Sequence, residues 1–95
     1  MSFEVVVIHH LDDDTYETEM DVIERKENSI IGTISVKYTY IFEEYEHKTG
    51  KKPIIYVGNR QVTNYERLPL ENVYESDEEW GKICLFPRSK YEFIF

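Results

Sequence analysis

Two histidines and three aspartates stand together near the start of the sequence, in the segment His9-His10-Leu11-Asp12-Asp13-Asp14. Imidazole nitrogens and carboxylate oxygens bind divalent transition metals, and His47 would supply a third nitrogen. Adjacent residues of a strand point to opposite faces of a sheet, so His9 and His10 cannot both reach one ion unless the strand breaks between them. We therefore interpret the cluster as a strand end followed by an acidic turn, with a small metal-dependent enzyme as the alternative.

Other catalytic arrangements have no counterpart in the sequence. Cys84 lies inside the apolar run of residues 83–86, where a thiol is typically an inert small hydrophobe. No serine stands in a Gly-x-Ser-x-Gly motif, and no glycine-rich phosphate loop is present. Most acids fall at expected outward or loop positions, which do not favour the coupled carboxylate pair of general acid–base catalysis. We predict a protein that is not an enzyme and that has no catalytic residue, bound metal or cofactor.

The charge balance gives the strongest chemical signal. The 95 residues include 19 acidic and 11 basic side chains, for a formal net charge of −8. A field of this sign repels nucleic acid and anionic membranes, and it speeds encounters with cationic surfaces. The excess acids lie in residues 1–29 and 71–95, whereas residues 30–70 are slightly basic. We predict a basic protein partner, with no direct binding to nucleic acid or membranes.

The slightly basic middle segment offers a competing interpretation. Its lysines and arginines alternate with tyrosines, a composition found on surfaces that stack single-stranded nucleic acid. The local excess of positive charge is small compared with the acidity of the whole chain. We favour a solvated rim that pairs with the protein's own acids.

The acids of residues 15–25 follow the period of a strand. Glu17, Glu19 and Asp21 alternate with Thr18, Met20 and other residues expected to face the core. Successive outward carboxylates on a strand lie about 6.6–7 Å apart, comparable to phosphates along one nucleic-acid strand. Such a row could imitate a phosphate backbone, and the alternative is a solubilising face that protects a sheet edge.

The elements that must position these residues are mainly strands. A largely apolar, β-branched run over residues 3–8 predicts an interior strand buried on both faces, and residues 15–42 predict a long antiparallel hairpin. Residues 42–48 also have apolar and charged side chains at helical spacing, so a short helix could begin there, at the end of the hairpin. A capping-box pattern at residues 76–79 allows one further helical turn. The other expected strands cover residues 54–57, 61–65, 83–86 and 91–95.

These elements predict one domain over residues 1–95. We expect a mainly β fold of the β-rich α+β type: a small antiparallel sheet or partly closed barrel of about six strands, with one or two short helices. The single cysteine excludes an internal disulfide, and the first residues carry no secretion signal. No apolar stretch approaches the roughly 20 residues of a membrane span. We expect a cytoplasmic protein.

The leading functional hypothesis is a non-catalytic acidic inhibitor, immunity protein or phage anti-defence protein. It would occlude a basic, nucleic-acid-binding partner such as a nuclease, as a mimic of nucleic acid, and would be a monomer or a homodimer. A structural subunit that assembles through strand edges, such as residues 91–95, is the alternative. The predicted partner-binding residues are Asp12, Asp13, Asp14, Tyr16, Glu17, Glu19, Asp21, Tyr74, Asp77, Glu78, Glu79 and Trp80.

Overall fold

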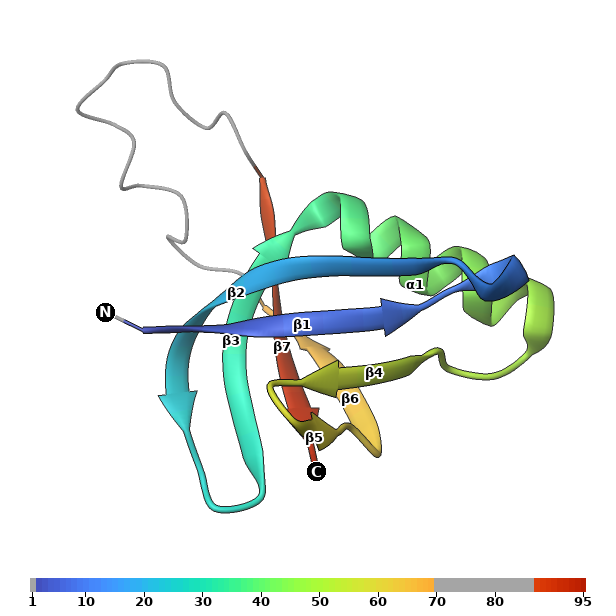
Figure 1. Cartoon of the computed structure of the whole chain (residues 1–95). Coiled ribbons are helices and arrows are strands. Elements are labelled where there is room, and N and C mark those ends of the chain that lie inside the picture. The colour runs from blue at the N-terminus through green and yellow to red at the C-terminus, as the bar shows by residue number, and fades with distance from the viewer. Residues whose placement is uncertain (1, 70–86) are drawn as a thin grey trace.

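Seven antiparallel strands form one sheet that curls into a half-barrel (Figure 1). The structure is a computed structural model, and it describes residues 2–69 and 87–95. Along the sheet the strands follow the order β5-β4-β1-β2-β3-β7-β6. The strands are β1 (Phe3–His9), β2 (Thr15–Arg25), β3 (Ser29–Ser35), β4 (Ile54–Val57), β5 (Arg60–Gln61), β6 (Asn64–Leu68) and β7 (Arg88–Ile94). The predicted small antiparallel, partly closed barrel is confirmed.

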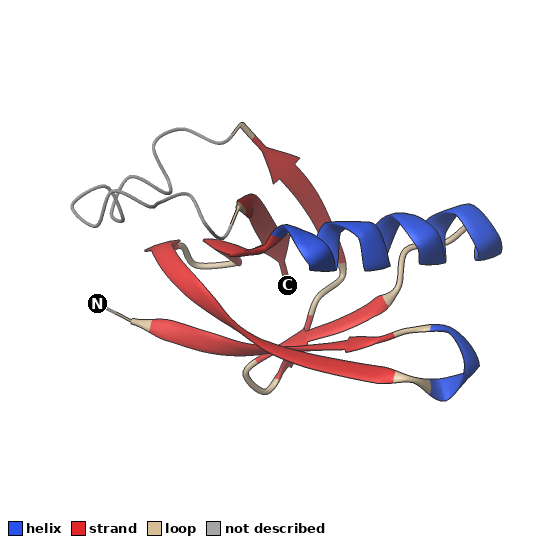
Figure 2. Cartoon of the chain, turned by 90° about the horizontal axis from the view of Figure 1, so that it is seen from above, coloured by secondary structure: helices blue, strands red, loops and turns tan. Residues whose placement is uncertain are grey.

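The helix α1 (Val36–Thr49) lies on the concave side of the sheet. Figure 2 shows it between the arm formed by β1 and β2 and the arm formed by β7 and β6. Its buried residues are Tyr38, Thr39 and Phe42. They face a core that the inner positions of the strands contribute, including Val6, Ile8, Met20, Ile30, Ile34, Ile55, Val57, Tyr65, Tyr91 and Phe93.

The prediction that the second strand of the hairpin continues beyond Ser35 is wrong. The chain leaves β3 there and enters α1, whose first turn is capped by the Ser35 hydroxyl, which accepts a hydrogen bond from the Lys37 N–H at 3.4 Å. The helix runs to Thr49 and ends at Gly50, where φ is +75° and the Gly50 N–H donates to the Glu46 carbonyl. The short helix predicted over residues 42–48 is therefore the second half of a longer one.

The first strand is interior in the sheet but is not buried on both faces. β1 pairs with β2 on one side and with β4 on the other, and Val6 and Ile8 are fully buried in the core. On the outer face, however, Phe3 is 56% exposed and Val5 is 39% exposed. Among the described elements, α1 covers the concave side, and the apolar run is buried on that side.

Two expectations about sheet edges are also wrong. Residues 91–95 were the expected route for edge-to-edge assembly, but β7 pairs with both β3 and β6. The acidic strand β2 lies between β1 and β3, so its carboxylates do not protect an edge. Among the described strands the edges are β5 and β6. The return strand expected over residues 61–65 divides into these two pieces, which pair with β4 and β7 respectively.

Several expectations lie outside the described residues. The capping-box pattern at residues 76–79, the strand expected over residues 83–86 and Cys84 all belong to this group. The same is true of five predicted partner-binding residues: Tyr74, Asp77, Glu78, Glu79 and Trp80.

Candidate functional site

The two adjacent histidines point to opposite faces of the sheet. His10 lies on the inner side with its side chain only 6% exposed, and its Nε2 is 3.0 Å from the Glu44 Oε1 on α1. His9 lies on the outer side, where its ring meets the edge of Tyr56 at 5.9 Å between centroids. The chain therefore separates the two imidazoles, as the strand geometry predicts.

The His10 ring is held as a structural contact between β1 and α1. The rings of Tyr16 and Tyr45 flank it at 5.7 and 6.0 Å. Because an ionised carboxylate only accepts hydrogen bonds, the His10 Nε2–H donates to Glu44. The Nδ1 atom is buried, and no described residue forms a hydrogen bond with it. Within residues 2–69 and 87–95, no group of three His, Cys, Asp or Glu side chains is arranged to hold a metal ion.

The contact between His10 and Glu44 predicts a specific pH dependence. The hydrogen bond from His10, helped by Lys48, lowers the pKa of Glu44 below its ordinary value. A carboxylate with a lowered folded-state pKa stabilises the fold above its unfolded-state pKa, and that contribution is lost as the pH falls through the folded-state pKa. We expect Glu44→Gln to reduce stability at pH 7 and to reduce it less at pH 3, because protonation of Glu44 weakens the contact as the pH falls. Urea unfolding of both proteins at the two pH values measures this difference. An equal loss at both pH values would contradict the ionic origin of the contact.

The predicted acidic turn forms a tight 3₁₀ turn, η1 (Leu11–Asp13), between β1 and β2. The His10 N–H donates to the Asp14 carbonyl at 2.7 Å, which closes the turn. Asp12 and Asp13 have φ values of +55° and +64°, a left-handed conformation that aspartate tolerates better than most residues. The side chains of Asp12, Asp13 and Asp14 are all exposed at this end of the sheet.

The predicted carboxylates of β2 share the outer face of the sheet. Glu17, Glu19 and Asp21 are all exposed and alternate with residues that face inward. We call these three residues the acidic row. Tyr16, predicted as an anchor for a partner, lies instead on the inner side, where it is half-buried and packs against the core. The acidic row is therefore formed as predicted, but without that tyrosine.

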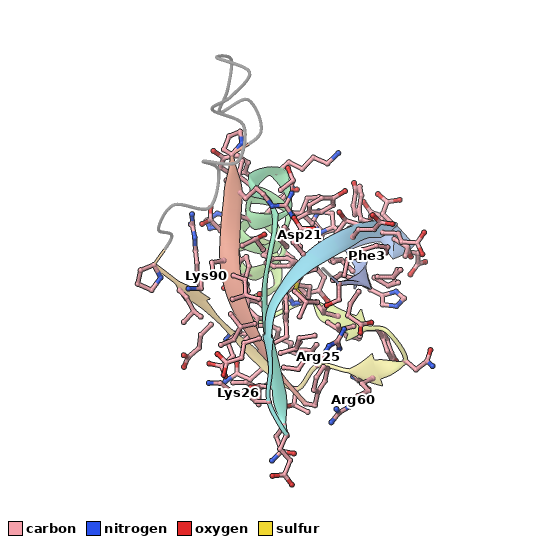
Figure 3. All side chains as sticks on the ribbon, turned by 90° about the vertical axis from the view of Figure 1, so that its left-hand side faces the viewer. Phe3, Asp21, Arg25, Lys26, Arg60 and Lys90 are labelled. Atoms are coloured by element: carbon pink, nitrogen blue, oxygen red, sulfur yellow. The ribbon has the colours of Figure 1, made fainter. Side chains whose placement is uncertain are left out.

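An apolar strip on β1 lies directly beside the acidic row. In the register of the two strands Phe3 is opposite Asp21, Val5 is opposite Glu19, and Val7 is opposite Glu17. Figure 3 labels Phe3 and Asp21, which lie on the neighbouring strands β1 and β2. We call Phe3, Val5 and Val7 the apolar strip, and the row and strip together the acidic–apolar surface.

The acidic row is only partly neutralised by other residues. The Arg88 guanidinium lies 3.5 Å from the Asp21 carboxylate, and it also donates hydrogen bonds to the side chain and backbone carbonyl of Thr33. Among the residues that the structure describes, no ion pair includes Glu17 or Glu19. Two of the three carboxylates are thus available to a cationic partner.

The apolar strip continues onto the next strand. Val7 is opposite Tyr56 and His9 is opposite Ile54, which is 47% exposed. The sequence did not predict this surface, because the residues that face out of β1 are as apolar as those that face in. Only the position of α1 decides which face is covered.

Comparisons with known proteins add no relative. No family model, curated protein sequence or solved structure matches this chain. Within the described residues, no helix has both the length and the apolar character needed to cross a membrane.

Proposed function

We propose that this chain is a non-catalytic binding protein whose acidic–apolar surface occludes a basic, nucleic-acid-binding partner protein. A nuclease or another effector of that class is the expected target, and inhibition or immunity is the expected outcome. The observation that carries the proposal is the register of β1 and β2, which sets exposed Phe3 and Val5 directly beside Asp21 and Glu19.

This combination suits an interface better than a purely solubilising face. Protein interfaces concentrate binding energy in buried apolar anchors, whereas charges around them guide encounter and select the partner. An acidic surface that served solubility alone would not need a phenylalanine with half its area exposed directly beside Asp21. The acidic row also lies away from the sheet edges, so protection against edge pairing does not explain it.

Assembly through strand edges has weaker support. The expected route, residues 91–95, lies inside the sheet. At the edge strand β6, the Lys52 ammonium donates to the Tyr65 carbonyl at 3.0 Å, and a lysine beside an edge strand hinders the addition of another strand.

Affinity capture from a lysate of the native host, followed by charge reversal, tests the proposal. The captured protein is purified, and its association with the chain is measured at low and moderate salt. For the double variant E17K/E19K we expect the association rate constant to fall by about tenfold or more at low salt, because electrostatic steering is lost. Duplex DNA should displace the chain from the partner.

A matched control distinguishes the effect of where the charges lie from the effect of the net charge of the protein. The double variant E43K/E66K changes the net charge equally, at exposed positions on α1 and β6. It should associate almost as fast as the unmodified chain. If the association rate constant fell equally in both double variants, or in neither, the acidic row would not be part of the interface. The proposal would then fail.

A further inference from the structure

A second surface of the molecule gathers positive charge around an open pocket. It lies where the tip of the β2–β3 hairpin, the β4–β5 turn, the start of β1 and Phe95 meet, and its volume is about 390 Å³. We call it the basic pocket. Its lining includes three cationic side chains, Arg25, Lys26 and Arg60, but only one acidic side chain, that of Glu4. This is a local excess of positive charge in a protein of net charge −8.

The two arginines come from facing elements and are held by different contacts. Figure 3 shows Arg25 on β2 and Arg60 across from it on β5. Arg25 pairs with the Glu4 carboxylate at 2.8 Å. Arg60 stacks on the Phe95 ring, with its Cζ 3.9 Å from the ring centroid, and no described carboxylate forms an ion pair with it. Its guanidinium is therefore oriented by the ring while its N–H groups keep their donor capacity.

The lysine of the pocket is also incompletely neutralised. The Lys26 ammonium pairs with the Glu92 carboxylate at 3.5 Å, which is the outer limit of a hydrogen bond. Glu92 in addition accepts a hydrogen bond of 2.7 Å from the Ser29 hydroxyl. Lys26 thus has donors free for a second anion.

The base of the pocket is apolar. Ile30 and Val57 line it and are each only 3% exposed, and the Phe95 ring forms a further apolar contact. Gly58, with φ of +62°, also lines the pocket, where a Cβ would lie 3.1 Å from the Glu4 carboxylate. A cavity of several hundred Å³ with an apolar base and a few convergent polar groups is typical of small-molecule sites.

We propose that the basic pocket binds a small organic anion, with a phosphate or carboxylate group against Arg60, Arg25 and Lys26 and an apolar or aromatic body over Ile30 and Val57. Guanidinium groups bind both kinds of oxyanion through paired hydrogen bonds. The basic pocket shares no residue with the acidic–apolar surface and carries the opposite charge. This inference does not depend on the proposed function.

Titration of the full chain with four probes, followed by amide NMR spectra, tests this proposal. The probes are phenyl phosphate, benzoate, inorganic phosphate and phenol. We expect saturable shifts at the amides of Gly58, Asn59, Arg60 and Phe95 with phenyl phosphate or benzoate, and the tighter of the two identifies the preferred anionic group. Inorganic phosphate, which lacks the body, and phenol, which lacks the charge, should each bind at least tenfold more weakly.

Two variants show whether the arginine is responsible. Arg60→Gln should weaken binding of the better probe by tenfold or more, whereas Lys48→Gln, an exposed change on α1, should leave it unchanged. The absence of saturable shifts with both organic anions would overturn the proposal. So would equal affinity for inorganic phosphate, or binding that Arg60→Gln does not weaken in a protein whose spectrum remains that of the folded chain.

Discussion

Replacing Phe42 with alanine is expected to lower the free energy of unfolding by about 3–5 kcal/mol, the usual cost of removing a fully buried aromatic ring. Phe42 is 2% exposed and is the main apolar anchor of α1 on the sheet. Its ring centroid lies 5.1 Å from that of Tyr65 and 5.3 Å from that of Tyr91, so the substitution also removes two aromatic contacts. Urea unfolding monitored by circular dichroism measures the change.

The same helix supplies a matched control. Tyr40 is 64% exposed, two residues before Phe42, and Tyr40→Ala should change stability by no more than about 0.5 kcal/mol. Comparable losses in the two variants would mean that α1 does not dock on the sheet through Phe42. The pair therefore tests the placement of the helix, which is the feature that the sequence predicted least well.

The sequence predicted a strand where α1 begins because the same residues fit both the period of a strand and the period of a helix. Val36, Tyr38, Tyr40 and Phe42 alternate with more polar side chains except at Ile41, as in a half-buried strand. Tyr38 and Phe42 are also four residues apart, which places them on one face of a helix. Tertiary packing decides between these alternatives, since the concave side of the sheet needs a cover and, among the described elements, α1 supplies it.

The acidic row could be predicted because its acids alternate strictly with residues that face the core. In a strand, such acids must all lie on the outer face. Each acid of the acidic row follows an inward-facing residue, so any strand over this segment exposes Glu17, Glu19 and Asp21 together. The apolar strip could not be predicted in the same way. Residues 3–8 are apolar at every position but one, and their sequence does not indicate which face α1 covers.

The basic pocket could not be predicted for a different reason. Its arginines and lysine come from two hairpins that are distant in the chain but adjacent at one end of the half-barrel. In the sequence, Arg25 and Lys26 belong to the most acidic segment. Their charge becomes significant only when the fold places Arg60 on the other side of the pocket.

Replacing Gly32 with alanine is expected to lower the free energy of unfolding toward the upper end of the 1–3 kcal/mol typical of overpacked cores. Gly32 is opposite Val22 in the β2–β3 ladder, beside the register shift between Val22 and Glu24. A Cβ there would lie 2.5 Å from the Asp21 carbonyl oxygen and 2.6 Å from the Met20 Cγ. A glycine at such a point lets two strands approach closely where the sheet bends.

Two further variants identify which contact is responsible. Gly50→Ala has open space around its new Cβ but requires a left-handed backbone with φ of +75°, so it should cost only about 1 kcal/mol. In a double-mutant cycle, Met20→Ala removes the side-chain clash with an alanine at position 32 but leaves the clash with the Asp21 carbonyl. We therefore expect partial rescue. Complete rescue would mean that the backbones of β2 and β3 can separate at no cost. The close approach at Gly32 would then not be required for the bend of the half-barrel.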